Sequence, residues 1–305
     1  MPEHPSLPPP SAPLASASWP PRYWLGGLIW LCGALAALYW LWRELVAGNP
    51  PVELALIGGS IAALATALGT LPALFNAGNG ERTRDAMLGF GAGVMLAAAS
   101  FSLVVPALAS LRAQGQGPFA ASLQVGLAVL AGAVLLLLIE RMVQARLDQG
   151  QHRAASEGRR RAAVWLFVLA VMLHNVPEGL AIGVGFAGDL QAGRALATGI
   201  AIQDVPEGLV IAMALRGIGQ SRLAAVGVGA LSGLAEPVAA VLGALIVGTS
   251  SLLLAPGLGF AAGAMLFVIG HSVLPEAHRG GRAGLAAGAL VVGFVLMMVL
   301  DTALA

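Results

Sequence analysis

Long apolar runs constrain this chain more than any other feature of its sequence. Several runs reach about 20 residues, which is the length that a helix needs to cross the hydrocarbon core of a bilayer. Hydrophobic residues make up 58% of the chain and charged residues only 10%, whereas soluble domains carry about 25% charged residues. Continuous apolar runs of this length argue for helices and against a β-barrel. We therefore predict an all-α polytopic membrane protein.

Breaks rich in Gly, Pro and Arg separate the candidate spans, as in GNPP at 48–51 and QGQGP at 114–118. Residues 1–22 are rich in Pro and Ser and are predicted to be a disordered tail. The run that follows is too long for the hydrophobic region of a signal peptide, so we interpret it as a retained helix. The predicted spans are roughly 23–43, 52–76, 86–111, 119–142, 163–187, 193–215, 223–247, 251–275 and 283–304.

The arginines indicate how these spans are oriented. All sixteen basic residues are Arg, which suggests a high-GC bacterial genome and therefore a bacterial inner membrane. With a cytoplasmic N-terminus, only Arg43, Arg112 and Arg194 lie outside, and the other arginines lie inside. This bias matches the positive-inside rule and predicts a C-terminus outside. It also makes the connection at about 143–162 cytoplasmic; we interpret its basic stretch EGRRRAA as topogenic rather than as a lipid-regulatory site.

Charge and cysteine content exclude some classes of partner and site. The net charge of +1 gives no argument for a nucleic-acid partner. The single cysteine, Cys32, excludes an intrachain disulfide and any site built from several cysteines.

Two similar polar units interrupt the fifth and sixth spans. Residues 174–179 read HNVPEG and residues 203–208 read QDVPEG. In each unit, residues three or four positions apart share one helix face, so each helix offers a compact set of nitrogen and oxygen ligands. Pro177 and Pro206 cannot donate backbone hydrogen bonds and should kink their helices, while Gly179 and Gly208 permit close helix approach. A third unit, Glu236–Pro237, lies near the middle of the seventh span.

The charges of these units require compensation. Glu178, Asp204, Glu207 and Glu236 are predicted near the bilayer midplane, and no Arg lies in the central part of these spans. A charge buried in the bilayer costs several kcal/mol unless it is compensated, so these carboxylates are protonated, face water or bind a cation. Two divalent ions would balance four carboxylates. The polar units offer one imidazole, two amides and several carboxylates, and no thiolate. This set of ligands suits Zn, Fe, Mn or Cd rather than Cu(I). A hydrogen bond from Ser232 is an alternative structural role for Glu236.

The paired units HNVPEG and QDVPEG resemble the signature of the ZIP (Zrt/Irt-like) divalent metal transporters, and the Glu-Pro at 236–237 resembles a third acidic position of that family. The resemblance covers most of the chain from about residue 52. It implies an eight-helix core at 52–305 built from inverted repeats, with the helix at 23–43 as an addition. It also implies a homodimer, an elevator-like movement of one helix bundle, and uptake of zinc, with Cd²⁺, Fe²⁺ and Mn²⁺ as further candidate cargoes.

The resemblance also implies residue roles. His174, Glu178, Gln203 and Glu207 match one metal site; Asn175, Asp204 and Glu236 match a second, with Glu178 and Glu207 bridging the two. Met95 is expected to line the entrance, and His271 and Glu276 the cytoplasmic exit. Two departures stand out: Gln203 replaces a histidine found in many members, and the cytoplasmic loop holds only His152. The resemblance therefore gives no support for metal sensing by this loop.

Two other classes remain open on the residues alone. A proton- or sodium-coupled permease for another solute could use the carboxylates as proton relays, but it should also show aromatic or Arg residues in a substrate pocket, and the two polar units of the motif helices supply neither. An intramembrane metalloenzyme is the second class. The chain has no H-E-x-x-H motif and no obvious nucleophile beside the cluster, so we do not expect an enzyme.

Overall fold

The computed structural model describes residues 21–75, 80–151 and 156–304. The predicted tail at 1–22 therefore lies outside the described residues except for its last two positions, and His152 also lies outside them. The chain divides into two compact units, residues 1–44 and residues 45–305. The first unit contains α1 (Pro21–Leu41), which matches the helix predicted at 23–43 and exposes Trp30, Tyr39 and Trp40. Whether α1 crosses the membrane stays a prediction.

The described residues of the second unit form helices joined by short turns. Eight of its helical segments are long and apolar enough to cross a membrane, and they coincide with the eight core spans predicted from the sequence. In chain order, the elements are α2 (Pro50–Thr70), η2 (Leu71–Phe75), α3 (Glu81–Ala97), η3 (Ala98–Val104), α4 (Val105–Ala113), α5 (Pro118–Gln151), α6 (Ser156–Gly188), α7 (Leu190–Gly217), α8 (Arg222–Ser232), α9 (Ala235–Gly248), η4 (Ser251–Leu253), α10 (Leu254–Val268), η5 (Ile269–Val273), α11 (Leu274–His278) and α12 (Ala283–Leu304).

Some segments differ in detail from the expectation. The span predicted at 223–247 is divided into α8 and α9 by a turn at Gly233–Leu234. Two other spans change from α-helix to π-helix just before a proline, at Pro106 and Pro275, where the missing N–H disrupts the regular ladder. The connection expected at about 143–162 is shorter, because α5 and α6 extend into it; sequences such as VQARLDQ consist mostly of good helix formers.

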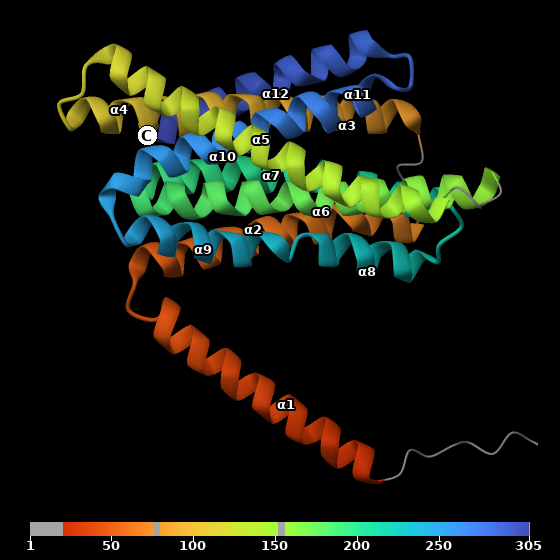
Figure 1. The fold of residues 1–305 in the computed structure, drawn as a ribbon. Helices are drawn as coiled ribbons and strands as arrows, with labels where there is room; N and C mark the ends of the chain where they lie inside the picture. Colours follow the sequence, from red (N-terminus) through yellow and green to blue (C-terminus); the bar gives the residue numbers. More distant parts are fainter. Residues whose placement is uncertain (1–20, 76–79, 152–155, 305) are drawn as a thin grey trace, which may run out of the picture. The chain divides into compact units, whose positions relative to one another are not determined.

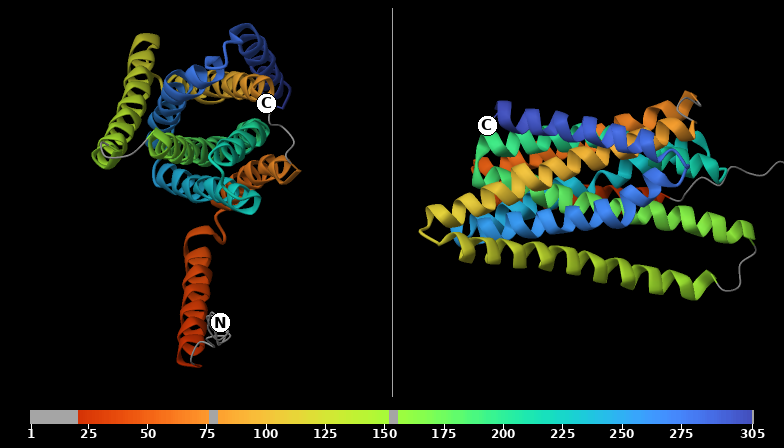
Figure 2. Two further views of the ribbon diagram at one scale, coloured as in Figure 1. Left: turned by 90° about the vertical axis from the view of Figure 1, so that its right-hand side faces the viewer. Right: turned by 90° about the horizontal axis from the view of Figure 1, so that it is seen from above.

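The eight spans pack as two bundles, and the segments of each bundle are not consecutive in the sequence. The first bundle consists of α2, α6, α7, α8 and α9, and the second consists of α3, η3, α4, α5, α10, η5, α11 and α12. The tightest pairs within them are α6 with α9, α2 with α7, α3 with α12, and α5 with α10. Figure 1 shows these helices side by side, and the left view of Figure 2 looks along them. A one-residue connection joins α6 to α7, where Asp189 caps α7 by accepting from the backbone N–H groups of Gln191 and Ala192.

Glycines explain how the helices inside each bundle pack so closely. In the first bundle, a Cβ added at Gly183 would collide with the backbone of Ala240 in α9. In the second bundle, a Cβ at Gly93 would collide with the backbone of Leu290 in α12. Small residues let helix backbones approach in this way and gain dispersion contacts in a membrane, where no hydrophobic effect draws helices together. Each bundle is therefore packed backbone against backbone.

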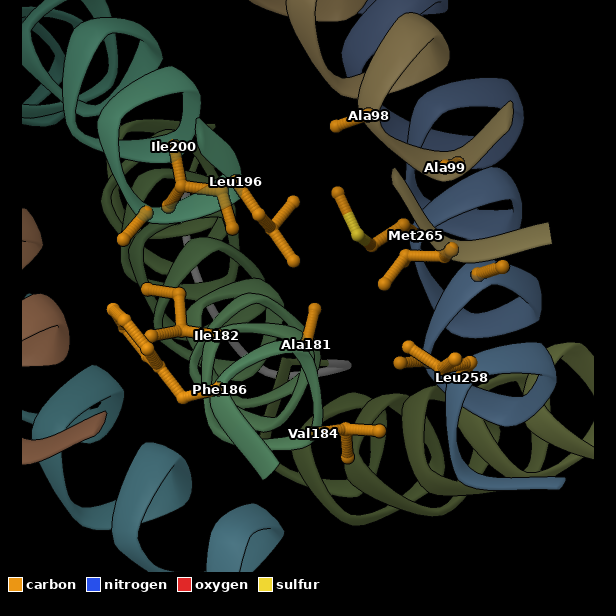
Figure 3. Packing of buried hydrophobic residues seen from close by; sticks show 14 of the residues in the cluster. Ala98, Ala99, Ala181, Ile182, Val184, Phe186, Leu196, Ile200, Leu258 and Met265 are labelled. Carbon is orange, nitrogen blue, oxygen red and sulfur yellow. The ribbon is translucent and has the colours of Figure 1, made fainter. Parts of the chain in front are cut away.

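The contact between the bundles is made differently. Side chains from η3 and α10, including Ala98 and Met265, face Ala181 of α6 and Ile200 of α7 across an apolar layer (Figure 3). Where a glycine lies at this contact, its neighbour is a side chain: a Cβ at Gly199 would meet the thioether of Met297 rather than a backbone. Apolar side chains, rather than backbones in direct contact at glycines, therefore form the contact between the two bundles.

Charged residues hold the second bundle together at its arginine-rich end. Arg282 binds the fully buried Asp85 over 3.0 Å and Glu81 over 3.1 Å, which ties the start of α12 to the start of α3. Arg84 lies 3.3 Å from Glu276 in α11, and Arg279 lies 3.2 Å from the same carboxylate. These pairs neutralise the fully buried Asp85 and the largely buried Glu276, which would otherwise carry uncompensated charges.

Candidate metal centre

The two repeated units face each other in the core of the first bundle. His174, Asn175 and Glu178 lie on α6, and Gln203, Asp204 and Glu207 lie on α7; both helices continue through their internal prolines, Pro177 and Pro206. The motif glycines bring neighbouring helices into contact, as the sequence predicted. A Cβ at Gly179 would collide with the backbone of Glu236, and a Cβ at Gly208 with the backbone of Thr66. The repeated glycines therefore place α9 and α2 directly against the polar units.

Three carboxylates form the centre of the site. Glu178, Asp204 and Glu236 each place one oxygen so that all three oxygens lie within 4.8 Å of one another, and all three side chains are buried. Glu236 lies in the first turn of α9, because the turn at Gly233–Leu234 divides its span. The positive end of the α9 dipole therefore favours a negative charge at this position. Glu207 lies close enough to Glu178 and Glu236 for their negative charges to repel one another.

Several polar atoms of this site lack a hydrogen-bond partner among the residues that the structure describes. Both carboxylate oxygens of Glu178 are buried without a hydrogen bond. The same is true of one oxygen each of Asn175, Asp204, Glu207 and Glu236. A buried polar atom without a partner costs about 1–3 kcal/mol, and more when it is charged, and native proteins contain few of them. Several such oxygens converging at one place are therefore suited to bind a cation.

The hydrogen bonds that are present orient the two amides and occupy one oxygen each of Asp204 and Glu236. The side-chain amide of Asn175 donates to the carbonyl oxygen of Ser232 over 3.1 Å, and the amide of Gln203 donates to Asp204 over 2.6 Å. Thr66 of α2 donates to Glu236 over 3.3 Å. The alternative role for Glu236 considered above was wrong in its partner, because the Ser232 hydroxyl donates to the carbonyl oxygen of Gly229.

His174 points toward the second bundle. Its Nε2 atom lies 3.5 Å from Oε1 of Glu140, a buried carboxylate on α5. His271 lies on the other side of this carboxylate, with its Nε2 atom 3.1 Å from Oε2. The hydroxyl of Ser272 also contacts Glu140, at 3.5 Å. The carboxylate of Glu140 is therefore held between two imidazoles that come from different bundles.

A cavity of about 40 Å³ lies beside the centre, between the bundles. Met95, His174, Gln203, Glu207 and Glu276 are among its lining residues. This volume accommodates water molecules or a partly hydrated ion. A second cavity of about 410 Å³ lies toward the arginine-rich end. The two cavities share Phe167, Val210 and Glu276 as lining residues, so they lie next to each other between the polar site and one end of the spans.

The structure brings the sequence-predicted residues together to different degrees. Glu178, Asp204 and Glu236 form the compact group, with Asn175, Gln203 and Glu207 adjacent to it. His174 and Met95 line the cavity, and Glu276 lies where the two cavities meet. His271 is half exposed and contacts Glu140 rather than the cavity.

Sequence reasoning missed Glu140 and Thr66. The signal for Glu140 was weak, because a carboxylate followed directly by Arg141 at the end of an apolar run resembles an ordinary helix end.

Eight membrane-spanning segments around a buried cluster of unpaired carboxylates define a polytopic membrane protein with a cation site in its core. The family model described as ZIP zinc transporter matches residues 146–301. The chain belongs to the ZIP family, as a bacterial member. Proteins of this family are transporters rather than enzymes.

Curated relatives extend this similarity over most of the chain. "Zinc transporter ZIPB" of Bordetella bronchiseptica is 48% identical over 257 residues, which cover 83% of this chain and 82% of the relative. "Zinc transporter GufA" of Myxococcus xanthus is 42% identical over 250 residues, covering 82% of this chain and 98% of the relative. "Zinc transporter ZIP11" of Xenopus tropicalis is 30% identical over 339 residues, covering 85% of this chain and all of the relative.

Proposed function

We propose that this protein carries zinc across a bacterial inner membrane into the cytoplasm. The observation that carries this proposal is the group of buried carboxylate and amide oxygens without protein partners around Glu178, Asp204 and Glu236. Relatives named zinc transporters support zinc as the cargo. The donor set suits a divalent ion of borderline hardness, so cadmium, iron(II) and manganese(II) are further candidates.

We propose that the centre holds two metal ions. One position is formed by His174, Glu178, Gln203 and Glu207, and the other by Asn175, Asp204 and Glu236 with Glu178 and Glu207 bridging. Two divalent cations match the charge of the four carboxylates, which would otherwise repel one another at short range. The first position borders the cavity, since His174, Gln203 and Glu207 line it. We assign the transported ion to this position.

Movement of one bundle past the other is the mechanism that the packing favours. Backbone contacts at glycines keep each bundle rigid, whereas flexible apolar side chains separate them. All seven proposed ligands belong to the first bundle, so it can move with its cargo. The positive-inside rule makes the arginine-rich end cytoplasmic, and the larger cavity opens toward that end. In this orientation His271 and Glu276 lie on the exit side. Assembly as a homodimer is a further part of the proposal.

The other classes are less well supported. A permease for an organic solute requires a pocket that recognises that solute, whereas the cavity beside the carboxylates has a volume of only about 40 Å³. Its lining includes aromatic Phe167 but no arginine among the described residues.

Metal flux into proteoliposomes tests the proposal. Wild-type protein should show saturable zinc uptake, and Glu178→Ala and Glu207→Ala should abolish it, because each removes a shared ligand. Glu53→Gln is the matched control, since Glu53 accepts a hydrogen bond from the exposed turn at Gly48. Wild-type flux in both Ala variants would refute the assignment. Assays with Zn, Cd, Fe and Mn, with and without a pH gradient, would establish selectivity and driving force.

A further inference from the structure

We infer that Glu140 competes with the transported metal for His174, so that loading the centre breaks a polar contact between the two bundles. This inference rests on the proposed function. It assigns a positioning role to Glu140, which is not one of the proposed metal ligands.

The location of the contact is the first argument. Glu140 and His174 are both buried, and their polar atoms approach to 3.5 Å from α5 of the second bundle and α6 of the first. The other polar contacts described above stay within one bundle: the pairs of Arg84, Arg279 and Arg282 belong to the second. The contacts in the apolar layer of Figure 3 are nonpolar, and they lack the directionality of the contact between Glu140 and His174. Glu140 and His174 therefore form a specific link across a contact that is otherwise apolar.

The orientation of His174 is the second argument. The three carboxylates with mutually close oxygens are Glu178, Asp204 and Glu236, and neither ring nitrogen of His174 joins this group. Nε2 is the ring nitrogen that lies beside Glu140, and it has no hydrogen-bond partner among the described residues. A nitrogen that binds a metal must be deprotonated, and we infer that Nε2 is the atom that binds the ion. Coordination of an ion by Nε2 beside Glu178 requires His174 to turn away from Glu140.

The surroundings of Glu140 supply the third argument. His271 and Ser272, both in η5 of the second bundle, contact the two oxygens of Glu140 at 3.1 Å and 3.5 Å. These partners keep the carboxylate in place when His174 turns away, so Glu140 does not follow the imidazole into the centre. When the ion departs, the same carboxylate is available to receive His174 again. The link thus opens on loading and closes on release.

Zinc affinity and transport kinetics of the full-length protein test this inference. Glu140→Gln removes the charge but keeps the shape, and it should bind zinc roughly tenfold more tightly in calorimetry because a charge-assisted competitor is lost. In proteoliposomes the KM for zinc should fall, and the maximal rate should fall as well, because release is no longer assisted. Glu140→Asp withdraws the carboxylate by one methylene and should change both quantities in the same direction. It is the second variant if Glu140→Gln fails to fold.

Two comparisons make the result specific. In a His174→Ala background, Glu140→Gln should leave zinc affinity unchanged, because the competition acts only through the imidazole. The control Glu53→Gln should bind zinc as the wild type does. Weaker zinc binding by Glu140→Gln would overturn the inference and would mean that Glu140 orients His174 as a ligand. An unchanged affinity, or an effect that persists without His174, would also overturn it. Failure of the wild type to transport zinc would instead refute the proposed function.

Discussion

The side-chain nitrogen of Asn175 donates a hydrogen bond to the carbonyl oxygen of Ser232 over 3.1 Å and thereby joins α6 to the end of α8. This bond determines which way the amide faces. The side-chain oxygen of Asn175 is buried and has no hydrogen-bond partner, so it remains available as a neutral ligand beside the carboxylates. A backbone oxygen at the break between α8 and α9 thus orients a proposed metal ligand on another helix.

Replacing this amide should weaken metal binding. We expect Asn175→Ala to lower zinc affinity by roughly tenfold or more, because both an oriented ligand and its anchor to Ser232 are lost. Calorimetric titration of the detergent-solubilised protein measures the effect. Asn49→Ala is a suitable control, since Asn49 precedes α2 and its side chain makes no capping hydrogen bond there. Equal zinc affinity in wild type and Asn175→Ala would remove Asn175 from the site.

Neutralising one carboxylate should change stability in opposite directions with and without metal. Glu178→Gln should stabilise the metal-free protein by on the order of 1 kcal/mol, because the repulsion from Asp204 and Glu236 is relieved. It should also reduce the stabilisation that zinc gives, because a ligand that binds only the folded state stabilises it in proportion to its occupancy. Thermal unfolding with EDTA and with zinc measures both effects. A uniform loss of stability in both conditions would contradict this account of the site.

The packing of glycines predicts a difference between two similar substitutions. In Gly183→Ala, the added methyl group collides with the backbone of Ala240 inside the first bundle. This overpacking should destabilise the protein by about 1–3 kcal/mol or more. In Gly199→Ala, the methyl group meets the flexible Met297 side chain between the bundles, which can shift. Gly199→Ala should therefore unfold closer to the wild-type temperature, and the reverse order would count against two rigid bundles.

Met95 should influence which metals pass. Its side chain is buried and lines the cavity together with His174 and Glu207. A thioether is a soft ligand that favours cadmium over zinc relative to oxygen ligands. Met95→Leu conserves volume and should cost less than about 1.5 kcal/mol of stability, while lowering the ratio of cadmium to zinc flux. An unaltered ratio would leave Met95 with a packing role only.

Zinc flux should fall as the external solution becomes more acidic. Carboxylate and imidazole ligands bind a metal only when they are deprotonated, so protons compete with the ion for the centre. The effect should appear as a rise in KM with little change in the maximal rate at saturating zinc. Zinc uptake followed by fluorescence at a series of external pH values tests this prediction. A KM that does not depend on pH would argue against titratable ligands at the loading step.

The sequence predicted the spans and the polar units well, because both depend on local patterns. Apolar runs bounded by Gly, Pro and Arg located the eight core segments, and the spacing of His174, Asn175 and Glu178 placed them on one helix face. Contacts between distant segments could not be read in this way. Glu140 reaches His174 from another helix, and Thr66 reaches Glu236 across 170 positions. Neither residue has a distinctive local pattern.

The break between α8 and α9 was also missed, for a different reason. Hydropathy treats residues 223–247 as one run, and Gly233 is one of many glycines in this sequence. The break depends on close packing, because a Cβ at Gly233 would contact α2 at Ala63 and Thr66. Tertiary contacts of this kind override the local preference of an apolar segment to continue as a helix.

Charge balance at the arginine-rich end has a consequence for the free-energy profile of transport. In the transport function that we propose, the four carboxylates of the centre form a deep free-energy minimum for a divalent cation. Glu276, the next carboxylate along the cavities, already contacts Arg84 and Arg279, so it offers a departing ion only a shallow minimum. The free energy of the ion along the proposed path therefore has one deep minimum, at the centre, and no second deep minimum on the exit side. In this proposal, an ion that leaves the centre meets only carboxylates already paired with Arg among the described lining residues of the second cavity. It can therefore diffuse away, which favours net movement over rebinding.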